Sequence, residues 1–106
     1  MTKIAYDEAE YCLSMKGHAG SAPKGEDLVC AALSMLMFTL EETVQDMREK
    51  LLPTITHTKS GVRIRCRPSG VYCIICRTIF RTVYTGCELL SRHYPEFVQT
   101  TELEGI

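Results

Sequence analysis

The sequence predicts an α+β domain: a small, mostly antiparallel sheet forms one layer, and two long helices packed on it form the second. Short segments with apolar residues at every second position are typical of half-buried strands. Two long segments with apolar residues at every third or fourth position are typical of helices. The order along the chain is strands, helix, hairpin, helix, as in two-layer α+β domains. With 106 residues, we expect a single domain over residues 1–106.

Five segments are predicted to be strands. Residues 2–7 and 10–16 come first, and residues 54–58 and 62–67 follow later as a hairpin around a Lys-Ser-Gly turn. Residues 97–103 can add a short edge strand. In the second strand of the hairpin, alternate side chains face opposite ways: Val62, Ile64 and Cys66 inward, and Arg63, Arg65 and Arg67 outward.

Two segments read as helices. Asp27 is the expected N-cap of the first, and Pro53 ends it. Thr39 and Glu42 have capping-box spacing, which would let that helix break or restart there. The second helix follows Gly70 and stops before Pro95. The first is apolar nearly all round over residues 29–38, which predicts burial on more than one side, in the core or at a subunit interface.

The net charge, the length of the apolar runs and the number of cysteines limit which classes of function we expect. The formal net charge is −1, with 12 basic and 13 acidic residues, so we expect no direct binding to nucleic acid. The apolar run from Leu28 to Leu40 is shorter than a membrane span, and no signal peptide precedes it. The six cysteines are therefore expected to be reduced thiols in the cytoplasm rather than a disulfide framework.

Cys30 and His18 are the candidates for chemistry. Cys30 falls in the first turn of the first predicted helix, where free N–H groups and the helix dipole favour a thiolate. His18 ends a strand and begins the glycine-rich loop that leads to this helix, so its imidazole could reach the sulfur. A cysteine with a histidine base is the working unit of a thiol nucleophile. By residue type and spacing alone, a core cysteine and a solvated histidine remain the alternative.

Two neighbours of Cys30 share its helical face. Asp27 precedes it by three residues and Ser34 follows by four. Asp27 could cap the helix or orient His18, and Ser34 could donate a hydrogen bond near the sulfur. The backbone amides of the first turn could hold an oxyanion. No cofactor or metal is needed for such chemistry, and none is predicted.

The motif around these residues closely resembles the Prp (YsxB-like) family of ribosomal-processing cysteine proteases. The family pattern is Gly-His-Ala, a short loop, then Gly-x-Asp, two aliphatic residues, Cys, two small residues, any residue and Ser. It is matched by Gly17-His18-Ala19 and by the run from Gly25 to Ser34. The run His93-Tyr94-Pro95-Glu96-Phe97-Val98 is similar to the family's segment after the last helix.

The resemblance implies a specific activity. It makes Cys30 the nucleophile, His18 the general base, and Asp27 and Ser34 supporting residues. It also implies a substrate-gating loop that contains Gly17, Ala19, Gly20, Ser21 and Gly25. The implied substrate is the N-terminal extension of the large-subunit ribosomal protein bL27, and the implied assembly is a homodimer. A diverged or prophage-associated paralogue that processes a capsid protein is the alternative within this family.

The remaining cysteines and a row of arginines are predicted to have structural roles. Cys73 and Cys76 form a C-x-x-C, which could belong to a zinc site or a redox pair, but it lacks a second pair at motif spacing. We expect Cys76 and Cys87 to face the core and Cys73 to be partly exposed. The arginine row at Arg63, Arg65 and Arg67 is read as the solvated face of a hairpin. The competing class of function is a non-enzymatic binding module, either one associated with the ribosome or one built on thiols or zinc.

Overall fold

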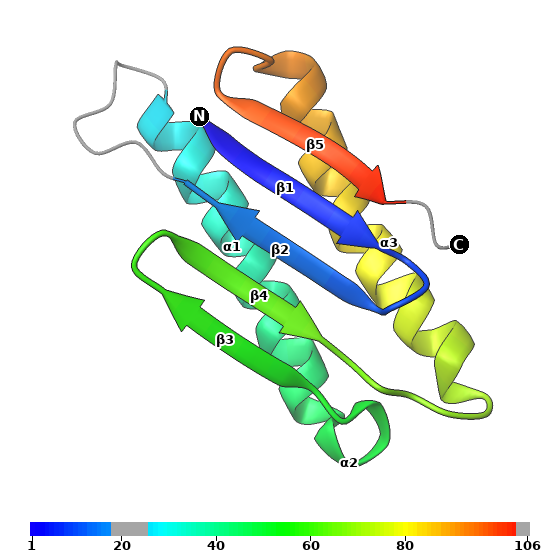
Figure 1. The fold of residues 1–106 in the computed structure, drawn as a ribbon. Coiled ribbons are helices and arrows are strands. Elements are labelled where there is room, and N and C mark those ends of the chain that lie inside the picture. Colours follow the sequence, from blue (N-terminus) through cyan, green and yellow to red (C-terminus); the bar gives the residue numbers. More distant parts are fainter. Residues whose placement is uncertain (18–25, 104–106) are drawn as a thin grey trace.

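The computed structural model describes residues 1–17 and 26–103, with only the backbone of Glu26 and Asp27. These residues form one layer of strands and one layer of helices, with α1 and α3 lying across the same face of the sheet (Figure 1). The elements in chain order are β1 (Thr2–Asp7), β2 (Cys12–Lys16), α1 (Glu26–Asp46), α2 (Arg48–Leu51), β3 (Thr54–Thr58), β4 (Gly61–Arg65), α3 (Tyr72–His93) and β5 (Val98–Leu103).

The five-stranded sheet has the order β3-β4-β2-β1-β5. The pairs β1–β2, β2–β4 and β3–β4 are antiparallel, whereas β5 returns after α3 and pairs with β1 in parallel. The Thr2 N–H donates to the Phe97 carbonyl over 2.9 Å at the start of this last pairing. The predicted fold class is confirmed, including β5 as an edge strand.

The core lies between the sheet and the two long helices. Alternate residues of β1 point into it, as the period of two requires. The Tyr6 ring lies beside two rings of α3, with centroids 6.4 Å from Phe80 and 5.0 Å from Tyr84. The helix layer supplies the other large buried groups, which include Leu33, Met37, Leu40, Val44, Phe80 and Tyr84.

Two details of α1 correct the sequence-based expectations. The helix begins at Glu26, so Asp27 is its second residue and not the N-cap. It also runs unbroken past Thr39, whose hydroxyl donates to the Met35 carbonyl over 2.7 Å instead of capping a new helix. The break comes at Met47, and the short α2 precedes Pro53.

Helix α1 ends at Asp46, before the expected end at Pro53, but its apolar segment is longer than the run Leu28–Leu40 noted in the sequence. Its segment Leu28–Asp46 has 19 residues and a mean hydropathy of 1.3, enough by length and composition to cross a membrane. The inner stripe of this segment, Val29, Leu33, Met37, Leu40 and Val44, is buried in the core. The core helix of a globular domain meets the same criterion, so length and hydropathy alone do not make this segment a membrane span.

Candidate active site

Cys30 lies near the beginning of α1 with its thiol half-buried and free. It is the fifth residue of the helix and so begins the second turn, one residue beyond the first turn expected from the sequence. Because helical side chains tilt toward the N-terminus, its side chain leans toward the first turn. The N–H groups of that turn have no partner within the helix, and the positive end of the helix dipole is there. This position suits a developing negative charge.

Ser34 lies one turn further along the same face of α1 and is also half-buried. Its side chain lines a cavity of about 190 Å³ between α1 and the β3–β4 hairpin. Because Cys30 and Ser34 are four residues apart within α1, they share one face of this helix. Asp27 has its backbone in the first turn of α1, but its side chain lies outside the described residues, as does its predicted contact with His18.

Gly17 fixes the backbone immediately before His18. Its φ is +82°, and a Cβ there would lie 2.6 Å from the Met1 carbonyl oxygen. Its N–H donates to the Ser60 carbonyl over 2.7 Å. Because both the conformation and the space exclude a side chain, glycine is required here. The end of β2 is thereby held against the β3–β4 turn, at the end of the molecule where α1 begins (Figure 1).

The remaining predicted loop residues lie outside the described residues: His18, Ala19, Gly20, Ser21 and Gly25. The pairing of His18 with Cys30 and the gating role of this loop therefore stay predictions. The described backbone supplies the two anchors of this segment, Gly17 at one end and Glu26 at the other.

The cavity beside Ser34 is mostly apolar inside and charged at one end. Met15, Met37, Phe38 and Val62 contribute apolar side chains to its lining. At the charged end, the His57 Nε2 lies 2.7 Å from the Glu41 carboxylate. No sequence pattern indicates a role for either Glu41 or His57. Glu41 follows Cys30, Ser34 and Phe38 at helical spacing, so its place on this face of α1 could be predicted from the sequence. The position of His57 opposite Glu41 depends on how the β3–β4 hairpin packs against α1, which the sequence does not show.

The other cysteines lie in different surroundings. Cys76 and Cys87 are buried and Cys73 is half-buried, as predicted. A hydrogen bond with the Cys76 thiol, together with burial, holds the pKa of Cys66 far above its usual range. Burial raises the pKa of Cys87 to about 12. The thiols of Cys66 and Cys87 are therefore protonated at neutral pH, which makes them poor nucleophiles.

The C-x-x-C shows no sign of a metal site. The Cys73 thiol shares a hydrogen bond with the Tyr11 hydroxyl, which raises the pKa of Tyr11, whereas Cys76 turns inward to Cys66. Among the described side chains, those of residues 1–17 and 28–103, no three of His, Cys, Asp or Glu gather in a geometry that could hold a metal ion. The two cysteines thus have separate structural surroundings.

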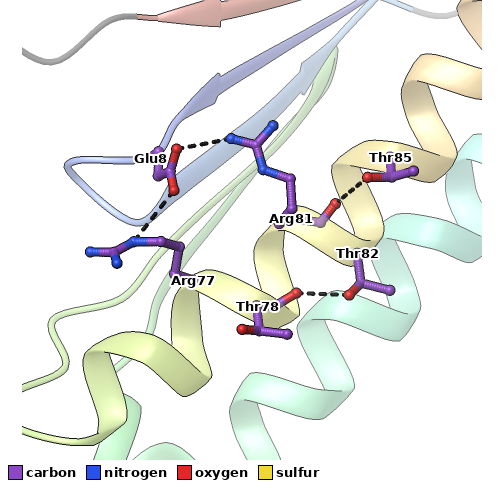
Figure 2. Close-up of a pocket in the computed structure, with 6 residues that line it drawn as sticks. All are labelled: Glu8, Arg77, Thr78, Arg81, Thr82 and Thr85. Carbon is purple, nitrogen blue, oxygen red and sulfur yellow. Dashed lines mark hydrogen bonds and ion pairs between the residues drawn. The ribbon is translucent and has the colours of Figure 1, made fainter.

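A second, larger cavity of about 430 Å³ lies where the β1–β2 turn meets α3. Figure 2 shows Glu8 between two guanidinium groups, 3.4 Å from Arg77 and 2.9 Å from Arg81. Arg81 also pairs with Glu102. The threonine hydroxyls along this wall donate to carbonyls of their own helix, as Thr82 does to Thr78 over 2.8 Å. Two arginines facing two glutamates leave no net charge, so this cluster ties the β1–β2 turn and β5 to α3.

The arginine row is also partly neutralised. Arg65 lies 2.5 Å from the Glu10 carboxylate, while Arg63 is exposed beside it. Both line a shallow hollow on the sheet face opposite the helices. This arrangement agrees with the prediction of a solvated hairpin face.

Comparison with known proteins decides the family. The family model for the cysteine protease Prp matches residues 1–99. The chain belongs to the Prp family of cysteine proteases. It is accordingly a peptide hydrolase, and the non-enzymatic alternative is set aside. No curated protein sequence matches the chain closely enough to count as a relative.

Solved structures share the Prp fold at low sequence identity. The essential ribosomal processing protease Prp from S. aureus, in complex with a substrate peptide, has a TM-score of 0.80 at 18% identity and covers 97% of this chain and 100% of its own. The SMU.848 protein from Streptococcus mutans has a TM-score of 0.69 at 21% identity, covering 96% and 91%. At these identities the likeness establishes the fold, and the roles of individual residues rest on the site itself.

Proposed function

We propose that this cysteine protease removes the N-terminal extension of ribosomal protein bL27 in the cytoplasm, acting as a homodimer with Cys30 as nucleophile and His18 as general base. The observation that carries the proposal is the position of Cys30. Its half-exposed thiol lies over the first turn of α1, inside the sequence pattern that defines the family's active site. The S. aureus relative is a ribosomal processing protease, which supports this choice of substrate.

The chemistry follows from the two side chains and the helix end. His18 accepts the thiol proton, and the sulfur attacks the carbonyl carbon of the cleaved bond. The resulting oxyanion faces the free N–H groups of the first turn of α1. His18 then gives its proton to the leaving amine, and a thioester remains on Cys30. Water hydrolyses the thioester after losing a proton to His18, which restores the thiol.

Asp27 and Ser34 support this chemistry without forming bonds to the substrate. In this proposal the Asp27 carboxylate orients His18. In the same proposal the hydroxyl of Ser34, one turn beyond Cys30 on α1, donates a hydrogen bond near the sulfur. These positioning roles predict losses smaller than those at Cys30 and His18.

A peptide cleavage assay tests the proposal. The substrate is a synthetic peptide that spans the bL27 extension and the first mature residues, and the products are identified by mass spectrometry. We expect the wild type to release the extension at one bond, and Cys30→Ala and His18→Ala to lose this activity. Cys73→Ala serves as the matched cysteine control and should cleave normally. Unchanged cleavage by Cys30→Ala would refute the mechanism, and an intact bL27 peptide with wild-type enzyme would refute the substrate.

A further inference from the structure

Two buried thiols meet where the chain passes from β4 to α3. Cys66 directly follows β4 and is 1% exposed, whereas Cys76, the fifth residue of α3, is 0% exposed. Their side chains are hydrogen-bonded to each other. This end of the sheet lies opposite the beginning of α1 (Figure 1), so the pair takes no part in the chemistry proposed for Cys30.

We infer that Cys66 and Cys76 form an intramolecular disulfide when the protein meets hydrogen peroxide, which makes this pair an oxidative modification site separate from the active site. A thiol–thiol contact between two segments is the arrangement from which a disulfide forms with the least movement of the backbone. This chemistry is independent of the proposed protease mechanism, because it uses neither Cys30 nor His18.

The reaction has two steps. The sulfur of Cys76 attacks one peroxide oxygen, the O–O bond breaks, and the departing hydroxide takes the thiol proton as water, which leaves a sulfenic acid on Cys76. The sulfur of Cys66 then attacks the Cys76 sulfur, the S–O bond breaks, and a second water leaves with the Cys66 proton. The two sulfurs are oxidised to a disulfide, and one hydrogen peroxide is reduced to two waters.

The hydrogen bond sets the order of these steps. It raises the pKa of Cys66 far above its usual range and lowers the pKa of Cys76, as expected when the Cys66 thiol donates and the Cys76 sulfur accepts. Peroxide oxidises the thiolate faster than the thiol. Cys76 therefore reacts first, and Cys66 lies in contact with it to complete the disulfide.

The C-x-x-C spacing alone would indicate a different disulfide, between Cys73 and Cys76. In the structure the Cys73 thiol shares a hydrogen bond with the Tyr11 hydroxyl instead. The Cβ atoms of residues three apart on a helix are about 5–6 Å from each other, whereas those of a disulfide are about 3.8 Å apart. The backbone of Cys66 is held in place from β2, because its N–H donates to the Tyr11 carbonyl over 2.9 Å. The fold therefore favours Cys66 as the partner of Cys76.

The connection between β4 and α3 gives peroxide a route to the pair. Arg67 and residues 69–71 are exposed, and no atom of the described residues would lie within 4 Å of a Cβ at Gly70. Exposed connections with few packing contacts open locally, and hydrogen peroxide is only slightly larger than water. The half-exposed Cys30 needs no such opening, so it should react with peroxide before Cys76 does.

Disulfide mapping tests the inference. Cys30→Ser protein, which lacks the competing thiol, is treated with hydrogen peroxide at pH 7, alkylated with iodoacetamide in urea and digested without reductant. Trypsin alone leaves residues 66–77 in one fragment, because Pro68 follows Arg67, so chymotrypsin is added to cleave after Tyr72. We expect fragments 66–72 and 73–77 joined by a disulfide that dithiothreitol breaks. A closed disulfide within fragment 73–77, or alkylated thiols in both fragments, would overturn the inference.

Variants in the same Cys30→Ser protein identify the partner. Cys73→Ala should keep the joined fragments, and Cys76→Ala should lose them. Cys87→Ala is the matched control, because Cys87 is equally buried in α3 and should keep them. Joined fragments in Cys76→Ala, or their loss in Cys73→Ala, would show that Cys73 is the reactive thiol and would overturn the assignment. Circular dichroism confirms that each variant is folded, and the map of the unsubstituted pair decides the inference even if one is not.

Thermal unfolding tests whether the disulfide fits the native core. The bond would close a loop of about ten residues in the unfolded chain, so oxidised Cys30→Ser protein should melt about 5 °C above the reduced form. Dithiothreitol should restore the lower value, and Cys66→Ala in the same protein should show no rise after peroxide. An unchanged or lower melting temperature in the cross-linked protein would mean that the bond does not fit the folded state, which would overturn its place there.

Discussion

The beginning of α1 and the interior beside the β4–α3 connection both carry cysteines, but in opposite surroundings. Cys30 is half-exposed over the first turn of a helix, where negative charge is favoured. Cys66 and Cys76 are buried against each other at the other end of the sheet. The hydrogen bond between them, together with burial, holds the pKa of Cys66 far above its usual range, so its thiol stays protonated. The comparison teaches that position in the fold, rather than the number of cysteines, separates a nucleophile from packing groups.

The largest expected effect is at Cys30. Cys30→Ala should lower kcat/KM at least about 10³-fold, because removing a nucleophile abolishes the covalent step. The melting temperature should stay within about 2 °C of wild type, because a half-exposed side chain contributes little packing. Cleavage kinetics and thermal unfolding of the same sample check both parts. An active variant would contradict the assignment of Cys30 as nucleophile. An unfolded variant would show that Cys30 contributes to packing, as the interior cysteines do.

Cys87 provides the reverse case. Its thiol is fully buried in the core, so Cys87→Ser should lower the free energy of unfolding by about 2 kcal/mol because it buries a more polar group. At a temperature where the variant is folded, kcat should be near the wild-type value. Urea unfolding followed by circular dichroism measures the first quantity. Loss of activity without loss of stability would contradict the assignment of Cys87 to packing.

Gly17 tests the anchor on the other side of the site. Gly17→Ala should lower the free energy of unfolding by about 1–3 kcal/mol, because alanine is strained at positive φ and its Cβ would meet the Met1 carbonyl. We also expect kcat to fall, since the residue directly precedes His18. Gly70→Ala is the control: it shares the positive φ but has open space around it. Equal destabilisation of both variants would show that the close contact at Gly17 contributes nothing.

A smaller effect is expected from alkaline pH. Burial raises the pKa of both Cys87 and Tyr6 to about 12, from ordinary values of 9.0 and 10.0. The unfolded chain then loses these protons at lower pH than the folded protein, so the free energy of unfolding should fall as pH rises from about 9 to 12. Urea midpoints measured across this range check the trend. The fall should be shallower in Cys87→Ala, and an identical slope would contradict the role of Cys87.

Much of the fold could be predicted from the sequence because the spacing of apolar residues and the positions of glycine and proline indicate the same elements. The alternation in β1 and β2 and the apolar stripe of α3 required no tertiary information. The prediction of a break near Thr39 is wrong because the Thr39 hydroxyl donates to a carbonyl of the preceding turn of the same helix. A threonine that caps a new helix and one that bonds back within a helix look alike in the sequence. The parallel pairing of β5 with β1 and the ion pairs of Glu8 with α3 join segments far apart in sequence, so no local pattern could predict them.

The candidate site divides in the same way. Cys30 and Ser34 could be placed on one face of a helix by spacing alone, and the motif adds His18. Phe38 and Glu41 continue that line, but only the position of the β3–β4 hairpin shows that they line a cavity together with Ser34. His57 has no distinguishing sequence context, and its contact with Glu41 exists only because β3 packs near α1.

The most direct measurement is the mass of the enzyme during turnover. The enzyme is mixed with the extended bL27 peptide, quenched in acid within the first turnover, and digested for peptide mapping. The account predicts an added acyl group, bonded as a thioester, on the fragment that contains Cys30 and on no other cysteine fragment. The same acyl group on Cys66, Cys73, Cys76 or Cys87, or cleavage that persists in Cys30→Ser, would contradict the claim that position over the first turn of α1 selects the nucleophile.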